Sequence, residues 1–320
     1  MHDTHAQLEV AVAKLRRGEL VAFPTETVYG LGAAAFDEAA VAKVFETKSR
    51  PSTNPLIVHV ASVDMARTAC TEWPEHAQIL AEAFWPGPLS IVVRRSERVP
   101  ASVAAGGPTV CLRMPAHPLA LALIEAFGEP IIGPSANRSG HVSPTTAEHV
   151  RTEFPDVFVL DGGPCRVGIE STVVDVTSNR PAILRPGAIG AARIETVLGV
   201  SLRNAPGEES IARSPGLLHR HYAPRTPTLL CEAWSEFDVP DARVVVLTQR
   251  GADVPKQFTA IHMPSDAEGY AALLYDALRR ADAMGTELII VERPSGPGDM
   301  SLWVAIGDRL ERASAQDKHP

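Results

Sequence analysis

One long stretch without a sustained hydrophobic period divides this chain of 320 residues. Residues 201–227 read SLRNAPGEESIARSPGLLHRHYAPRTP and are rich in proline, glycine and charge. Helix and strand patterns flank this stretch on both sides, so we predict a linker between two domains, residues 1–200 and 228–320. Loops of this length without secondary structure are usually functional or disordered.

Apolar periodicity in residues 1–200 alternates irregularly between helical and extended patterns. It predicts helices over 6–17, 38–47, 62–70, 74–84, 117–127, 145–153 and 190–198. It predicts strands over 19–23, 55–60, 89–94, 109–113, 129–133, 156–160, 172–176 and 182–185. Several strands follow one another directly, which favours an open, twisted mixed α/β sheet over a strict βαβ repeat.

The pattern beyond the linker is simpler. Strands are predicted over 228–232, 243–248 and 286–292, with a helix over 266–284 before the last of them. This order predicts a second, smaller, Rossmann-like α/β domain with a parallel sheet.

Composition excludes several classes of protein. Hydrophobic residues make up 45% and charged residues 21% of the chain, which is ordinary for a globular protein and excludes a disordered one. The formal net charge is −8 with no visible basic face, which argues against a main role in binding a nucleic-acid backbone. Cys70, Cys111, Cys165 and Cys231 are far apart, which argues against a zinc site or a disulfide framework.

The N-terminal segment and the overall hydropathy bear on the compartment. The segment reads as an amphipathic helix, not as a signal peptide with a basic start and a long apolar run. Because no run of about 18 apolar residues exists, we predict no membrane span. The sequence therefore predicts a cytoplasmic protein.

Two closely spaced cations form the first candidate site. Lys48 and Arg50 leave a predicted helix and enter a proline-rich turn, and side chains two residues apart in an extended segment point to the same side. Such a pair can clamp a phosphate, which Arg can bind bidentately. The same cations would also be favourable at a helix C-terminus through its dipole, so the spacing fits both interpretations.

Two predicted strands each carry a polar side chain in an unusual place. His59 shares a strand face with Ile57, where a lone histidine is more often structural than catalytic. Arg113 shares a face with Thr109 and Cys111, and an inward guanidinium must find an anion or acceptors. A bound anion and an internal salt bridge are equally compatible with this pattern.

Polar loops supply the next candidates. Ser135 and Asn137 lie in the run SANRSG after an apolar strand, which suits either close approach to a ligand or an ordinary polar turn. Thr145 is predicted to open a helix, with Glu148 at capping-box spacing, and free N–H groups at such an end favour phosphate.

Two further motifs are weak. The run GLGAAA at 30–35 matches the dinucleotide pattern G-x-G-x-x-A, but Pro24 interrupts the strand before it. His219 and His221 form an H-x-H pair in the linker without an evident third metal ligand.

Taken in order, a series of motifs over residues 15–200 resembles the YrdC-like family. They are FPTETVYGLG at 23–32, KSRP at 48–51, NPLIVH at 54–59, FWPGPL at 84–89, RMPAHP at 113–118, PSANRSG at 134–140, SPT at 143–145, ESTVVD at 170–175 and LRPG at 184–187. The linker motifs SPG at 214–216 and HYAP at 221–224, together with the second domain, resemble the long two-domain threonylcarbamoyl-AMP synthases. The second domain itself is matched loosely, through AIGDRL at 305–310.

This resemblance implies a reaction and its participants. L-threonine, bicarbonate or CO2, and ATP would give threonylcarbamoyl-AMP and pyrophosphate, with Mg²⁺ bridging the phosphates. Downstream tRNA threonylcarbamoyl transferase proteins would then use the product to make threonylcarbamoyladenosine (t6A) in tRNA. The family's first domain is an open, twisted sheet with a concave, positively charged site.

The resemblance also implies roles for individual residues. Those expected around ATP are Lys48, Arg50, Asn54, Thr109, Asn137, Thr145, Arg185, His221 and Tyr222. Those expected around L-threonine are Thr25, His59, Arg113, Ser135 and Ser171. Lys48, Arg50, Ser135 and Asn137 are the expected catalytic group, and no protein-bound metal is expected. The linker is expected to fold over the site as a lid, with His221 and Tyr222 touching the nucleotide.

Two other functions fit parts of the same pattern. YrdC-like domains occur in carbamoyl-adenylate-dependent carbamoyltransferases, but those carry large additional domains or cysteine pairs that this sequence lacks. YrdC-like surfaces can also bind double-stranded RNA or tRNA, which the acidic balance disfavours as a main role.

Overall fold

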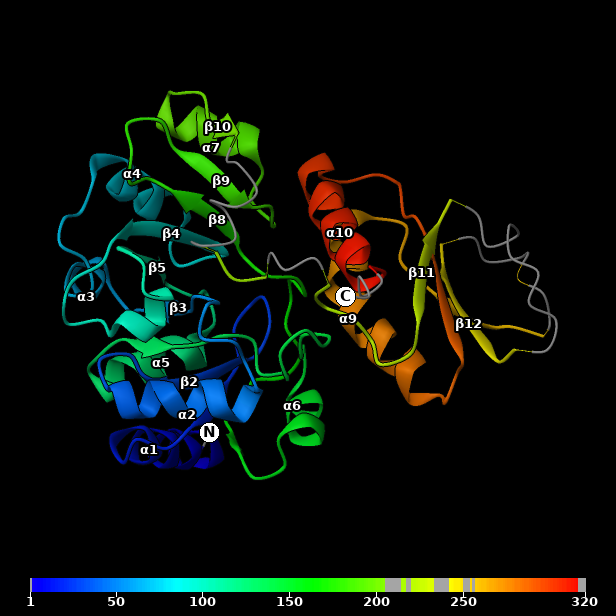
Figure 1. The fold of residues 1–320 in the computed structure, drawn as a ribbon, viewed down its shortest axis with the longest axis horizontal. Helices are drawn as coiled ribbons and strands as arrows, with labels where there is room; N and C mark the ends of the chain where they lie inside the picture. The colour runs from blue at the N-terminus through cyan, green and yellow to red at the C-terminus, as the bar shows by residue number, and fades with distance from the viewer. Residues whose placement is uncertain are drawn as a thin grey trace.

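A computed structural model describes residues 2–204, 214–216, 220–232, 242–249, 254 and 257–315. It contains a large domain, coloured blue to green in Figure 1, and a smaller one, coloured yellow to red. The predicted fold class is confirmed, because the large domain holds a mixed sheet and the small one a parallel sheet. Among the described residues, no helix is long and apolar enough to cross a membrane.

The large sheet has ten strands in the order β10-β9-β8-β4-β5-β3-β6-β2-β1-β7. Their bounds are β1 Val21–Phe23, β2 Gly30–Ala34, β3 Ile57–His59, β4 Leu89–Arg94, β5 Thr109–Arg113, β6 Ile131–Ile132, β7 Phe158–Val159, β8 Thr172–Asp175, β9 Ala182–Arg185 and β10 Arg203–Asn204. The pairs β3–β5 and β4–β8 are parallel, whereas β4–β5 and β8–β9 are antiparallel. Alternate positions of β1 and β6 belong to different cores, with Ala22 and Ile132 in one and Val21 and Ile131 in the other.

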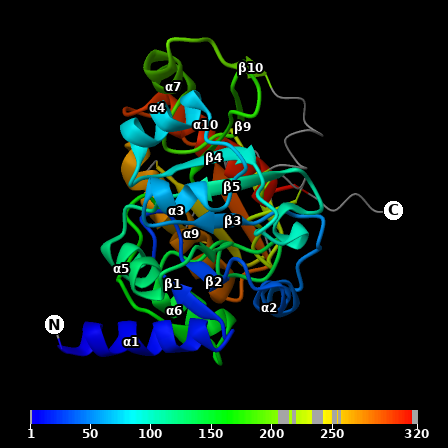
Figure 2. The same ribbon diagram turned by 90° about the vertical axis from the view of Figure 1, so that its left-hand side faces the viewer.

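Helices cover both faces of this sheet (Figures 1 and 2). They are α1 His2–Arg16, α2 Glu38–Lys48, α3 Val63–Arg67, α4 Glu75–Phe84, α5 Pro118–Phe127, α6 Ala147–Glu153 and α7 Ala191–Leu198, with a 3-10 turn at Ala101–Ala104. The main core joins α2 and α4 to the central strands through residues such as Val44, Leu80 and Ile91. A second core joins α1 and α5 to β1 and β6, with Leu15, Leu123 and Ile131 fully buried or nearly so.

The small domain is a parallel sheet covered on one face by two helices. Its strands follow the order β11-β14-β12-β13, with bounds β11 Thr228–Cys231, β12 Val244–Thr248, β13 Thr259–His262 and β14 Leu288–Glu292. The helices are α9 Ala267–Ala283 and α10 Met300–Ala313, and Figure 1 shows both between this sheet and the large domain. These helices therefore form the surface that meets the large domain.

The two domains share one apolar core rather than a thin contact. One cluster of buried apolar side chains contains residues from both domains and the linker. It includes Val28, Val142 and Ile169 of the large domain, Tyr222 of the linker, and Leu274, Tyr275 and Ile306 of α9 and α10. Gly168 approaches α9 so closely that a Cβ atom there would lie 2.2 Å from the carbonyl oxygen of Ala271. Apolar contact of this kind fixes the relative placement of the domains.

The structure excludes the dinucleotide interpretation of residues 30–35. This segment is strand β2, which pairs antiparallel with β1 and β6, and not a phosphate-binding turn. The strand was absent from the predicted set because its sequence, GLGAA, has low strand propensity. Its glycines leave room for Phe23, whose ring would lie 2.9 Å from a Cβ at Gly30.

Two local predictions are wrong. Thr145 does not open the following helix, because Thr146 is its cap and accepts a hydrogen bond from the backbone N–H of His149. Lys48 and Arg50 do not lie in one extended segment, because Lys48 ends helix α2 and Ser49 adopts a left-handed φ of 50°. In both places the boundary of the helix follows hydrogen bonds that spacing alone does not specify.

The small domain contains elements that the sequence analysis omitted. Helix α10 has a cap at Asp299, which accepts from Ser301 N, and buries Leu302, Ile306 and Leu310. That spacing is a helical signal and could have been found. Strand β13 has only one buried residue of its four, so its periodicity is weak. His219 and residues 205–213 of the linker lie outside the described residues.

Substituting Gly168 tests how strongly the domains depend on close contact. Gly168→Ala adds a methyl group against α9 at a residue whose φ is +80°, so both strain and overlap oppose it. We expect the free energy of unfolding to fall by about 2–4 kcal/mol, from roughly 1 kcal/mol of backbone strain and about 1–3 of overpacking. Thermal or denaturant unfolding measures this loss.

Gly163→Ala is the matched control. Gly163 has a similar φ of +78°, but a Cβ there meets nothing within 4 Å. It should show the strain alone, about 1 kcal/mol. Equal losses in the two variants would contradict a close contact between Gly168 and α9.

Candidate active site

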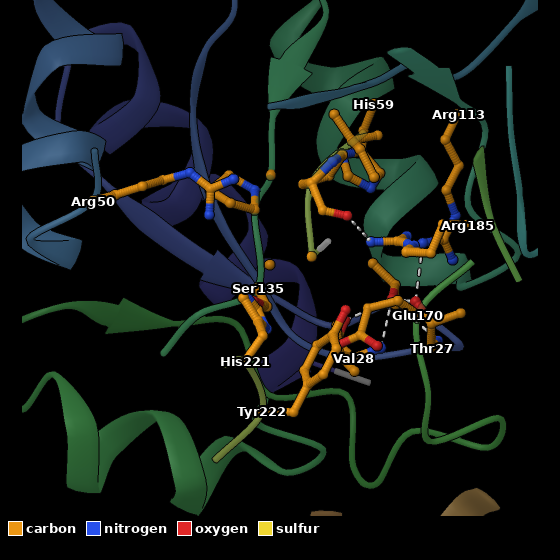
Figure 3. A pocket seen from close by; sticks show the side chains of 17 residues that line it. Thr27, Val28, Arg50, His59, Arg113, Ser135, Glu170, Arg185, His221 and Tyr222 are labelled. Atoms are coloured by element: carbon orange, nitrogen blue, oxygen red, sulfur yellow. Dashed lines mark hydrogen bonds between the residues drawn. The ribbon is translucent and has the colours of Figure 1, made fainter. Parts of the chain in front are cut away.

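A cavity lies between the large domain and the linker (Figure 3), and its empty volume, including space open to solvent, is about 510 Å³. Its lining residues are Thr25, Thr27, Val28, Gly30, Arg50, Ile57, His59, Arg113, Gly133, Pro134, Ser135, Glu170, Arg185, Pro215, Gly216, His221 and Tyr222. Most of its polar side chains are almost inaccessible, with Thr25, His59 and Arg185 each only 2% exposed. These side chains therefore lie inside the pocket and not on the outer surface.

Strand ends bring the lining residues together. His59 and Arg113 end the parallel neighbours β3 and β5 and are partners in register, so their side chains lie side by side on one face. Arg185 ends β9, and Glu170 lies just before β8. Figure 3 shows Arg50 on one side of the cavity and Arg113 and Arg185 on the other. The sheet thus gathers cations that are far apart in sequence.

Arg113 is held by a buried ion pair. Its Nη2 lies 2.8 Å from Glu26 Oε1, and the two side chains are only 4% and 3% exposed. Its Nη1 donates to Thr27 Oγ1 at 2.9 Å, and its Nε donates to the carbonyl oxygen of Gly87 at 3.3 Å. The internal salt bridge is therefore present, and because Arg113 also lines the cavity it does not exclude a bound anion.

Arg185 joins the sheet to the linker. Its Nε and Nη2 donate to the carbonyl oxygen of Ser171 at 3.1 and 2.9 Å, and Nη2 also donates to Ser171 Oγ. Its Nη1 donates to the carbonyl oxygen of Pro215 at 3.0 Å. Because all these acceptors are uncharged, the positive charge of Arg185 is not neutralised by them.

Arg50 is the third lining cation, and its acceptors among the described residues are neutral oxygens. Its Nε donates to the carbonyl oxygen of Asn54 at 3.2 Å and its Nη2 to that of Pro55 at 2.9 Å. Burial lowers the pKa of Arg50 to about 10, with Arg185 adding to the effect, so the group remains charged at neutral pH. The cavity consequently has an excess of positive charge.

Lys48 lies behind the cavity wall and supports the loop that forms it. Its Nζ donates to the carbonyl oxygens of Ser135 and Asn137. Burial, followed by the nearby charge of Arg50, holds the pKa of Lys48 well below its usual range. Asn137 Nδ2 closes the same loop by donating to the carbonyl oxygens of Arg138 and His141, both at 2.8 Å.

Six of the predicted site residues do not line the cavity. They are Lys48, Asn54, Thr109, Asn137, Thr145 and Ser171. Ser171 lies behind Arg185 and hydrogen-bonds to Ser90 Oγ at 2.7 Å. Thr145 contacts His149 at the start of α6, and Thr109 begins β5, where it pairs with Arg94. The other predicted residues, from Thr25 to Tyr222, do line it.

Glu170 is a lining residue to which the sequence analysis gave no role. Its Oε1 accepts from Ser143 Oγ at 2.7 Å, and its Oε2 accepts from Tyr275 Oη at 2.8 Å and from Arg309 Nε at 3.3 Å. Burial alone would raise the pKa of Glu170, but Arg309, Arg185 and these hydrogen bonds hold it below its ordinary value. No local signal in the sequence identifies Tyr275 and Arg309 as its partners, since both come from the second domain.

Several buried polar atoms at the cavity have no hydrogen-bond partner among the described residues. They include His59 Nδ1, His221 Nδ1 and Tyr222 Oη. Burial and the neighbouring Arg113 hold the pKa of His59 well below its usual range, and burial and Arg50 do the same for His221. Both imidazoles are therefore neutral at neutral pH. Buried polar groups are normally paired, so these atoms fit a site that receives a polar ligand.

The described residues do not fit a protein-held metal ion. No group of three or more His, Cys, Asp or Glu side chains in the described parts of the chain is arranged to hold one. The carboxylates closest to the lining, Glu26 and Glu170, are already paired with Arg113 and Arg309. We derive no chemical step through a metal.

The buried Glu26–Arg113 pair should be important for stability. Glu26→Gln keeps the shape of the side chain but leaves Arg113 as an uncompensated buried charge, so we expect the free energy of unfolding to fall by about 3 kcal/mol. Denaturant unfolding of the two proteins measures the difference. Glu72→Gln is the control, because Glu72 pairs with Arg94 at 3.1 Å on the surface. That variant should melt like the parent protein, and an unchanged Glu26→Gln protein would contradict the pairing.

Comparisons with known proteins cover almost the whole chain. Residues 13–187 match the Sua5/YciO/YrdC family model, described as "Telomere recombination", and residues 189–315 match that of the threonylcarbamoyl-AMP synthase C-terminal domain. The threonylcarbamoyl-AMP synthases of Pyrococcus abyssi and Bacillus subtilis are each 41% identical over 96% of this chain, covering 94% and 93% of their own lengths. The crystal structure of P. abyssi Sua5 complexed with L-threonine matches with a TM-score of 0.88 and 40% identity, over 96% of this chain and 94% of that one. The chain therefore belongs to the threonylcarbamoyl-AMP synthase family, in the form that carries both the Sua5/YrdC domain and the C-terminal domain.

Proposed function

We propose that this enzyme makes threonylcarbamoyl-AMP and pyrophosphate from L-threonine, bicarbonate or CO2, and ATP. The observation that supports this most directly is the cavity that Arg50, Arg113 and Arg185 line together. Among the described lining residues, Glu170 is the only carboxylate, and it is paired with Arg309. ATP, bicarbonate and the threonine carboxylate are all anions, and an excess of buried positive charge favours them. The relative from P. abyssi was crystallised with L-threonine, which supports the same substrate here.

Two groups of lining residues suit the two larger substrates. We assign L-threonine to Thr25, His59, Arg113 and Ser135, with Ser171 behind them. A guanidinium fork matches a carboxylate, and neutral hydroxyl and imidazole groups suit the amine and hydroxyl of threonine. Arg113 is not free to bind the substrate carboxylate alone, because it already pairs with Glu26. The substrate carboxylate would therefore bind beside that ion pair.

We assign ATP to Arg50, Arg185, His221 and Tyr222, among which Arg50 and Arg185 lie on opposite sides of the cavity (Figure 3). Five other residues predicted to bind ATP do not line the cavity, namely Lys48, Asn54, Asn137, Thr145 and Thr109. For Lys48 and Asn137 we propose a supporting role, because both hold the loop that carries Ser135. Mg²⁺ would enter with the phosphates of ATP, since phosphate oxygens and water are its usual ligands.

The proposed chemistry has two steps. The neutral amine of threonine bonds to the carbon of CO2 and loses a proton, giving a carbamate. A carbamate oxygen then bonds to the α-phosphorus of ATP while the bond to the β-phosphate oxygen breaks and pyrophosphate leaves. Phosphoryl transfer of this kind requires alignment and neutralisation of charge more than a strong base. Arg50 and Arg185 are placed to supply that neutralisation.

Enclosure is the second contribution of the protein. A carbamate reverts to amine and CO2, and an adenylate reacts with water, so exclusion of water protects both. Part of the cavity lining comes from the linker, through Pro215, Gly216, His221 and Tyr222. Because these linker residues border the cavity, we propose that linker 201–227 is a lid that opens and closes.

The product implies further partners. We propose that downstream tRNA threonylcarbamoyl transferase proteins in the cytoplasm consume threonylcarbamoyl-AMP to form t6A. Direct binding of tRNA or double-stranded RNA would be weak, because the net charge of −8 opposes a polyanion.

Pyrophosphate release tests the reaction and the substrate together. The full chain incubated with ATP, Mg²⁺ and bicarbonate should release pyrophosphate when L-threonine is added, and much less with serine, valine or no amino acid. A chromatographic assay should recover threonylcarbamoyl-AMP from the same mixture. Release that is independent of threonine would refute the proposal.

Arg113 tests the assignment of the threonine-binding residues. Arg113→Ala removes the fork expected to bind the carboxylate, and a hydrogen bond between charged groups contributes about 1.5–3 kcal/mol, so the threonine KM should rise by about 10- to 100-fold. Titration calorimetry should show nearly unchanged affinity for ATP. Thermal unfolding serves as the control, because the variant also leaves Glu26 unpaired, and Arg113→Lys provides a milder change. Equal losses of threonine and ATP affinity would contradict the assignment.

A further inference from the structure

Arg309 is a fully buried cation at the joint between the domains. It comes from α10 in the second domain, and its exposed fraction is 0%. Its Nε lies 3.3 Å from Glu170 Oε2, and its Nη1 donates to the carbonyl oxygen of Pro186 at 2.6 Å. Its guanidinium carbon lies 5.6 Å from the centre of the Tyr222 ring. One side chain of the second domain therefore contacts both a cavity residue and a lid residue.

Tyr275 of α9 repeats the same pair of contacts. Its Oη donates to Glu170 Oε2 at 2.8 Å. Its ring stacks on that of Tyr222, with centroids 5.7 Å apart and an interplanar angle of 24°. Arg309 and Tyr275, from two helices of the second domain, thus both contact Glu170 and Tyr222. Arg309 and Tyr275 do not themselves line the cavity.

Tyr222 needs such support because its backbone is in an unusual conformation. Its φ of 60° lies in the left-handed region, which is disfavoured for a residue with a side chain. Its side chain is 1% exposed and faces Tyr275, Arg309 and His221. Conformations of this kind persist only where the surrounding contacts determine them, and they are common at switch regions.

We propose that the second domain supports the lid in its closed position, a role we call the seat of the lid. In this role Arg309 and Tyr275 are positioning residues that hold Tyr222 and Glu170 in the closed arrangement. The inference rests on the proposed role of the linker as a lid over ATP. The second domain would then affect nucleotide binding indirectly, through Tyr222 and Glu170, without itself contacting the nucleotide. The alternative explanation is that Arg309 has a purely structural role and only joins the two domains.

Arg279 allows the two explanations to be separated. It also comes from α9 and is largely buried, and it joins the domains through the carbonyl oxygens of Val142 and Ser143 and through Glu153. Arg279 has no direct contact with Tyr222 or Glu170 in this set, although Ser143 also donates to Glu170 through its hydroxyl. Arg279→Lys therefore weakens the interface while the side chains that contact Tyr222 and Glu170 stay in place.

The test is a double-mutant cycle on the full chain, with thermal unfolding and the ATP KM of threonine-dependent pyrophosphate release as readouts. Arg309→Lys and Tyr222→Ala should each raise the ATP KM by about tenfold. Because Arg309 acts through Tyr222, the double variant should be no worse than about twofold beyond Tyr222→Ala alone. Arg279→Lys should lower the melting temperature and change the ATP KM by less than twofold.

The outcomes that overturn the proposal are distinct. Multiplicative effects of Arg309→Lys and Tyr222→Ala show that the two residues act independently, which refutes the seat and leaves the lid intact. A normal ATP KM in Tyr222→Ala refutes the lid and the seat together, whereas absence of pyrophosphate release from the parent chain refutes the proposed reaction.

A milder variant keeps the test decisive if Arg309→Lys does not fold. Tyr275→Phe retains the stacked ring and loses only the hydroxyl that binds Glu170. We expect it to raise the ATP KM by about threefold or more, with little change in the threonine KM. A change below twofold in this variant would overturn the proposal by itself.

Discussion

The buried contact between Glu170 and Arg309 is the interaction on which the arrangement of the site depends. Glu170 lies in the large domain beside the cavity, and Arg309 is fully buried in the small one. A buried ion pair is stable only when its remaining hydrogen-bonding capacity is satisfied. Here Ser143 and Tyr275 donate to the carboxylate, and the carbonyl oxygen of Pro186 accepts from the guanidinium. The pair therefore requires both domains to be docked.

This contact also explains the electrostatics of the cavity. A free Glu170 would cancel part of the charge of Arg50, Arg113 and Arg185 and oppose an anionic ligand. Because Arg309 neutralises it from outside the lining, the cavity keeps its excess of positive charge while the net charge of the chain is −8. Net charge describes the solvated surface, and a few buried side chains determine the charge inside.

Much of the fold was predictable because its signals are local. Alternation put His59 on one strand face with Ile57, and Arg113 on one with Cys111, and the structure pairs both sets in register on the parallel neighbours β3 and β5. Strand β2 was missed because GLGAA has little strand propensity and is held by pairing with β1 and β6. The capping prediction for Thr145 failed because Thr146 offers the same hydroxyl one residue later. Neighbours of similar chemistry make such boundaries ambiguous from sequence alone.

The sequence by itself determined the family motifs, the strand faces and the cations available to the site. Those properties depend on residue type and spacing over a few positions. Only the tertiary structure decided which residues line the cavity, since Lys48 and Asn137 turn out to support a wall while Glu170 forms part of it. It also decided that Tyr275 and Arg309 meet Glu170, at separations of 105 and 139 residues along the chain. Such contacts arise from the docking of two independent hydrophobic surfaces, which no local pattern specifies.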